Sequence, residues 1–128
     1  MNGMLLAVTL ALNGVKVLEI DHVPNNISYR TALGPGELAS RARVRVESRD
    51  PRAITTIVSA IQKTGTRPDV ATADLRYAIR LRNARGATVA TIYLDAFGLR
   101  GVVDGQPVRY ADDAIKRAVV SAFPALYR

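Results

Sequence analysis

Residues 75–95 decide the fold, and they read LRYAIRLRNARGATVATIYLD. On both sides of the middle, apolar residues alternate with polar or charged ones, which is the period of a strand that buries one face. Between the two runs, Asn83-Ala84-Arg85-Gly86 supplies the residue types of a tight turn. The stretch therefore predicts a β-hairpin with strands over 75–82 and 88–95.

The register of this hairpin determines which side chains share a face. A four-residue loop pairs 82 with 87, 80 with 89 and 76 with 93. In that register one face is apolar and the other carries a row of guanidinium groups. The apolar face holds Tyr77, Ile79 and Leu81 beside Ala90, Ile92 and Leu94, and the basic face holds Arg76, Arg80 and Arg82 with Tyr93.

A second stretch repeats the alternation of arginine with small or apolar residues. Residues 41–46 read RARVRV, and a strand over 42–48 directs Arg43 and Arg45 to one face. Together the two stretches predict a half-solvated sheet with a basic exposed face.

Acidic side chains nearby offer an alternative, purely structural role for these arginines. Val15–His22 reads as a strand with Glu19 and Asp21 on one face, and these acids would pair with Arg43 and Arg45 if the two strands are neighbours. Residues 76–85 contain no acid. We therefore expect the arginines of that segment to be exposed and to lack a full set of carboxylate partners.

Two helices are predicted outside the strands. Asp50-Pro51 supplies a capping carboxylate and a proline for the first turn, and Pro124 ends a second helix over 111–123. Apolar residues follow the helical period in both segments. The expected buried residues are Ile54, Ile57, Val58 and Ile61 in the first helix and Ile115, Val119 and Ala122 in the second.

Shorter segments complete the chain. Because a strand proline cannot donate a backbone hydrogen bond, the piece after Pro107 is expected at a sheet edge. The other expectations are a long connection over 23–40 with one helical turn at its end, a polar loop over 66–74, and a short strand over 99–103.

These elements define an α+β fold, with a mostly antiparallel sheet of four to six strands and two helices packed on one face. We expect residues 15–128 to form a single domain. Residues 1–14 fit either a degenerate export signal or an N-terminal strand, so both a periplasmic or secreted and a cytoplasmic location stay open. The apolar run over 4–12 is too short to span a bilayer.

Charge composition favours anionic partners. The 128 residues carry a net charge of +7, and segments 41–52 and 76–85 contribute +3 and +4. Localised charge produces a field that attracts acidic surfaces. Codon bias is an alternative cause, since arginine outnumbers lysine fifteen to three.

The sequence offers little for catalysis, and we expect no enzyme, cofactor or metal. The chain has no cysteine and one histidine, His22, whose neighbour Asp21 points to the opposite side of a strand. Asp112-Asp113 is interpreted as a charged helix start. Gly34-Pro35-Gly36 lacks the lysine and hydroxyl of a phosphate-binding loop.

The sequence thus predicts a small non-catalytic protein-binding module of the inhibitor, immunity or accessory type. It would bind a protein partner with an acidic surface through the basic sheet face and adjoining loops. The alternative is a nucleic-acid-binding protein that uses the same arginines, although few aromatic residues accompany them.

Overall fold

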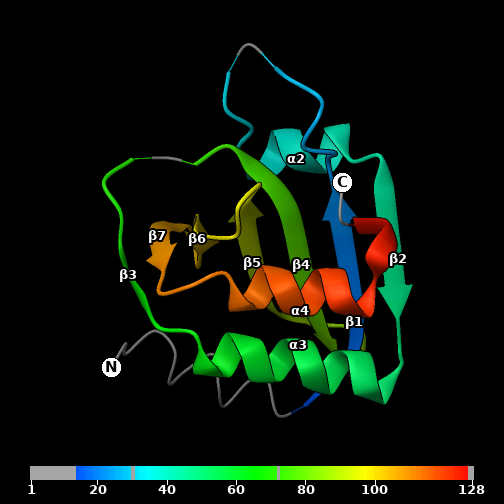
Figure 1. Cartoon of the computed structure of the whole chain (residues 1–128). Coiled ribbons are helices and arrows are strands. Elements are labelled where there is room, and N and C mark those ends of the chain that lie inside the picture. Colours follow the sequence, from blue (N-terminus) through cyan, green and yellow to red (C-terminus); the bar gives the residue numbers. More distant parts are fainter. Residues whose placement is uncertain (1–13, 30, 72, 127–128) are drawn as a thin grey trace.

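The computed structural model describes residues 14–29, 31–71 and 73–126, which form one antiparallel sheet with α-helices on both faces (Figure 1). The hypothesis of an export signal or strand over 1–14 falls almost wholly outside the described residues. The strands are β1 (Val15–His22), β2 (Val44–Ser48), β3 (Thr66–Pro68), β4 (Leu75–Asn83), β5 (Thr88–Asp95), β6 (Arg100–Val103) and β7 (Gln106–Tyr110). The helices are α2 (Pro35–Arg41), α3 (Pro51–Lys63) and α4 (Ala114–Ala122), followed by the short 3₁₀ helix η1 (Pro124–Leu126).

The strand order across the sheet is β2-β1-β4-β5-β6-β7-β3. This arrangement confirms the α+β class and the mainly antiparallel sheet. The described part of the chain differs from the prediction in its counts, with seven strands instead of four to six and three α-helices instead of two.

The hairpin of β4 and β5 forms as predicted, but its register differs by two residues. Arg80 pairs with Thr91 instead of residue 89. One residue of the shift comes from the turn, in which Asn83 instead of residue 82 bonds to Ala87. The other comes from a bulge between Leu81 and Arg82. A shift of two keeps every side chain on its face, so the predicted apolar face is confirmed.

Helices α3 and α4 cover that apolar face, in front of the sheet in Figure 1. Asp50 begins α3 as expected, because its carboxylate accepts a hydrogen bond from the backbone N–H of Arg52 at 3.1 Å. Ile54, Ile57 and Ile61 of α3 are buried in this main core. Ile115 and Val119 of α4 are buried in the same core, as predicted, and Ala122 is half-buried against it.

Helix α2 lies on the opposite face, where the sequence predicted only one helical turn. Its Leu38 is fully buried in a second apolar cluster with Leu75 and Ala78 of β4. The side chain of Ala78 points away from α3 and α4, because Tyr77 and Ile79 on either side of it point toward them. Among the described residues, α2 thus covers one end of this sheet face.

Two expectations about the far end of the sheet are wrong. Residues 66–68, expected as loop, form β3 and pair with β7, so β7 is not an edge strand. Pro107 is tolerated there because β3 pairs only with residues 108–110. The carbonyl oxygen of Pro107 accepts a hydrogen bond from the backbone N–H of Asp69, the residue after β3. The missing N–H of Pro107 would lie on this same side of β7, and it therefore faces the point where β3 ends.

Among the described residues, no helix has the length and apolar character needed to cross a membrane.

Candidate binding surfaces

The arginines of β4 form ion pairs instead of an open basic surface. Arg80 donates to Asp21 at 2.7 Å and to Glu19 at 3.2 Å, and Arg82 donates to Glu19 at 3.2 Å. These contacts exist because β1 lies between β2 and β4, which places Glu19 directly opposite Arg80. The expectation that Arg80 and Arg82 are exposed and lack a full set of carboxylate partners is therefore wrong.

Asp21 is the most buried member of this group, with only 1% of its side chain exposed. Burial is the largest single influence on Arg80 and would lower its pKa, but the hydrogen bond to Asp21 and the negative charges of Asp21 and Glu19 together outweigh it and raise the pKa overall. Arg80 thus stays charged across the physiological range. The pair stabilises the sheet and leaves little of Arg80 available to a partner.

Arg76 is buried and holds a loop in place. Its guanidinium donates to the carbonyl oxygens of Pro24 and Ile27 at 3.0 and 2.7 Å, and to Asp74 at 2.9 Å. The same group lies 5.6 Å from the ring centre of Tyr29. The predicted exposure of Arg76 is wrong, because the 23–40 connection folds over it.

The other predicted site residues differ in accessibility. Arg43 and Arg45 are exposed, although Arg45 also donates to the carbonyl of Ala39 at 2.8 Å. Tyr93 is half-buried against the second apolar cluster. Of the predicted basic face, the arginines of the β2 region are the most exposed, although Nε of Arg45 also lies 3.9 Å from Oδ1 of Asp21, the pairing that the sequence offered as an alternative.

These two arginines flank an open sheet edge. Strand β2 is the first strand of the sheet, and no strand of the described chain pairs with its outer side. Alternate backbone N–H and C=O groups of such a strand point outward and can accept another strand. The opposite edge, β3, is three residues long and contains Pro68, both of which discourage pairing.

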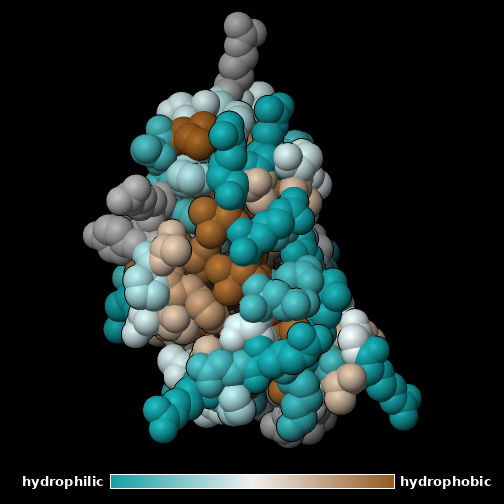
Figure 2. Space-filling model, turned by 90° about the vertical axis from the view of Figure 1, so that its right-hand side faces the viewer, coloured by the Kyte–Doolittle hydropathy of each residue, from teal (hydrophilic) through white to brown (hydrophobic). Residues whose placement is uncertain are grey.

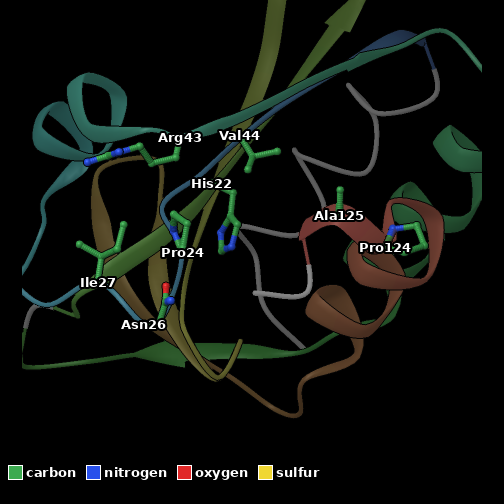
Figure 3. Close-up of a pocket in the computed structure, with 8 residues that line it drawn as sticks. All are labelled: His22, Pro24, Asn26, Ile27, Arg43, Val44, Pro124 and Ala125. Atoms are coloured by element: carbon green, nitrogen blue, oxygen red, sulfur yellow. The ribbon is translucent and has the colours of Figure 1, made fainter.

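A pocket of about 950 Å³ opens next to β2 (Figure 3). Its floor includes His22, which is buried, stacks on Tyr77 with ring centres 4.3 Å apart, and donates from Nδ1 to the carbonyl of Arg76 at 3.0 Å. In Figure 3 the guanidinium of Arg43 extends away from His22, so the pocket lining is mainly apolar. The remaining lining residues are Pro24, Asn26, Ile27, Val44, Pro124 and Ala125.

Figure 2 views the molecule from the β2 side and shows apolar residues gathered in the middle of that face, bordered by hydrophilic ones. Val44 and Val46 of β2 are half-buried and pack against the main core. Their side chains point to the α3 side of the sheet, whereas those of Arg43 and Arg45 point to the other.

A second open pocket, of about 620 Å³, lies at the far end of the sheet. Its lining combines Arg67, Arg100 and Arg109 with the exposed side chains of Phe97 and Leu99. The sequence analysis missed these arginines, because they occur on three separate short strands and none belongs to an alternating run. Only the strand register brings them together.

Comparisons with protein-family models, with curated proteins and with solved structures found no match. Among the described residues, no group of three or more His, Asp or Glu side chains is placed to hold a metal ion.

Proposed function

We propose that this protein is a binding module that captures an extended segment of a partner protein by strand addition along the outer edge of β2. The observation that carries the proposal is the five-residue unpaired edge of β2, with accessible arginines on one side and an apolar region on the other. In strand addition, main-chain hydrogen bonds supply affinity and alternate side chains supply specificity.

The chemistry of the two sides specifies the partner segment. On one side Arg43 and Arg45 favour carboxylates, and on the other Val44 and Val46 favour apolar side chains. Since side chains alternate across an added strand, a segment that alternates acidic and apolar residues satisfies both sides. The preferred partner is therefore an acidic, extended peptide segment.

This mode of capture suits a small inhibitor, immunity or accessory protein, which acts by occupying or carrying a segment of another protein.

Nucleic acid is the weaker alternative partner. The ion pairs of Arg76, Arg80 and Arg82 leave fewer guanidinium groups for phosphates, and Tyr93 is too buried to stack a base.

Peptide selection followed by hydrogen exchange tests the proposal. Peptides selected from a random display library against the whole protein should be enriched in alternating acidic and apolar residues. In the complex, alternate backbone amides of residues 43–49 should become protected from exchange, because added main-chain hydrogen bonds cover them. Docking through side chains alone would not protect those amides.

Charge reversal provides the matched comparison. Arg45→Glu should weaken peptide binding at least tenfold, whereas Arg85→Glu, which changes an exposed arginine of the β4–β5 turn, should leave it unchanged. Selected peptides that protect no amide of β2, or that bind Arg45→Glu as tightly as the wild type, would contradict strand addition. Binding that falls steeply with salt and is competed by single-stranded DNA would favour the nucleic-acid alternative.

A further inference from the structure

The second pocket contains a row of three arginines across neighbouring strands. Arg67 of β3 is directly opposite Arg109 of β7, and Arg109 is directly opposite Arg100 of β6. Directly paired residues of an antiparallel sheet share a face, and their Cβ atoms lie only about 5 Å apart. The three arginines therefore lie side by side on β3, β7 and β6, the strands at the left of the sheet in Figure 1.

One carboxylate lies among these arginines. Oδ2 of Asp69 accepts from Nε of Arg100 at 2.7 Å and lies 3.7 Å from Nε of Arg109, and its Oδ1 accepts from the N–H of Val70. The hydrogen bond from Arg100 lowers the pKa of Asp69 below its ordinary value, so the group is ionised at neutral pH. With Asp95, which also lines the pocket, two carboxylates accompany the three guanidinium groups, so one positive charge is in excess.

The remaining donors are accessible. Arg67 is exposed and forms no ion pair with any residue that the structure describes, and Arg109 is half-exposed, with its contact to Asp69 longer than a hydrogen bond. Like charges placed directly opposite one another destabilise a sheet. An anion bound between Arg67 and Arg109 would remove that repulsion and use the forked donors that suit phosphate oxygens.

Apolar groups next to the arginines define the rest of the ligand. Phe97 is 71% exposed and Leu99 45% exposed, and both line the pocket together with Tyr110. Asp95 also lines it, but Oδ1 of this carboxylate already accepts from the backbone N–H groups of Leu99 and Arg100. The pocket thus offers unused cationic donors beside an aromatic ring.

We infer that this pocket binds a small phosphate monoester that carries a flat aromatic group. The phosphate lies between Arg67 and Arg109, and the aromatic group packs on Phe97. This site is at the opposite end of the sheet from β2 and does not depend on strand addition there.

An NMR titration of the whole protein tests the inference, with phenyl phosphate, inorganic phosphate and AMP as probes. Phenyl phosphate should shift the amide signals of residues 66–68, 97–100 and 108–110, and it should bind at least tenfold more tightly than inorganic phosphate. Tighter binding of AMP than of phenyl phosphate would identify a nucleotide as the source of the phosphate ester. Weaker binding of AMP would identify a simple aryl ester.

Three surface variants and one control complete the test. Arg67→Gln and Arg109→Gln should each raise the Kd for phenyl phosphate at least fivefold, and Phe97→Ser should remove the preference over inorganic phosphate. Arg85→Gln, far from the pocket, should bind like the wild type. Equal affinity for phenyl phosphate and inorganic phosphate, or Arg67→Gln and Arg109→Gln variants that bind like Arg85→Gln, would overturn the inference.

Discussion

Gly101 offers a sharp test of how the sheet is built, because it gives room to a side chain from a neighbouring strand. Tyr110 of β7 reaches across β6, and its hydroxyl donates to the carbonyl of Tyr93 on β5 at 2.7 Å. A Cβ atom on Gly101 would lie 1.8 Å from that carbonyl oxygen and 2.9 Å from the tyrosine hydroxyl. Both distances are shorter than side-chain contacts allow, and one of the two groups is backbone.

We expect Gly101→Ala to lower the free energy of unfolding by about 2 kcal/mol or more. Overpacking of this kind typically costs about 1–3 kcal/mol, and displacement of the hydroxyl loses a hydrogen bond worth about 0.5–1.5 kcal/mol. The gain in strand propensity returns only about 0.5–1 kcal/mol. Urea denaturation of the wild type and the variant measures the difference.

Two further variants control this measurement. Gly36→Ala lies in α2 with open space around the added Cβ, so it should raise stability by up to about 1 kcal/mol. Tyr110→Phe removes the hydrogen bond without the clash and should cost only about 0.5–1.5 kcal/mol. A Gly101→Ala protein as stable as the wild type would show that β5, β6 and β7 are not packed as described.

Three other predictions concern the core, a buried arginine and acid stability. Ile57→Ala should lower the free energy of unfolding, measured by urea denaturation, by about 2–5 kcal/mol, whereas Thr55→Ala on the exposed side of α3 should lower it by less than about 0.5 kcal/mol. Equal losses would mean that the inward face of α3 is misassigned. Arg76→Gln should lower the free energy of unfolding by more than about 1 kcal/mol and speed hydrogen exchange in residues 24–29. If the loss of stability is no larger than that of the exposed variant Arg85→Gln, Arg76 does not hold the loop. Asp69 has a lower pKa in the folded protein than its ordinary value of 3.8, so its contribution to stability is complete above that value and is lost as the pH falls through the folded pKa. Below about pH 4 the wild type should therefore lose stability more steeply than Asp69→Asn. Parallel curves of stability against pH for the two proteins would refute this linkage.

Local patterns predicted the parts of the fold that depend on neighbouring residues. The alternation over 75–95 identified the central hairpin and its buried face, and Asp50-Pro51 identified the start of α3. Strand β3 was missed because three residues are too few to show a period. Its existence depends on pairing with β7, which lies forty or more residues away along the chain.

The candidate surface was predicted less well for a related reason. The alternation correctly placed Arg80 and Arg82 on the face opposite Tyr77, Ile79 and Leu81. Whether an arginine on that face is accessible depends on which strand lies beside it, and a local sequence pattern does not predict strand order. The insertion of β1 between β2 and β4 supplied the acids that the segment itself lacks.

The position of Glu19 and Asp21 makes the charge of their sheet face unusually easy to change. These two side chains contact arginines from the strands on both sides, so each acid masks more than one positive group. A single substitution of Glu19 by an uncharged residue would remove the carboxylate partner of Arg82 and leave Arg80 paired with Asp21 alone. Loss of one acid from β1 thus adds a net positive charge to this face of the sheet, which gives evolution a short route to new anionic partners without rebuilding the fold.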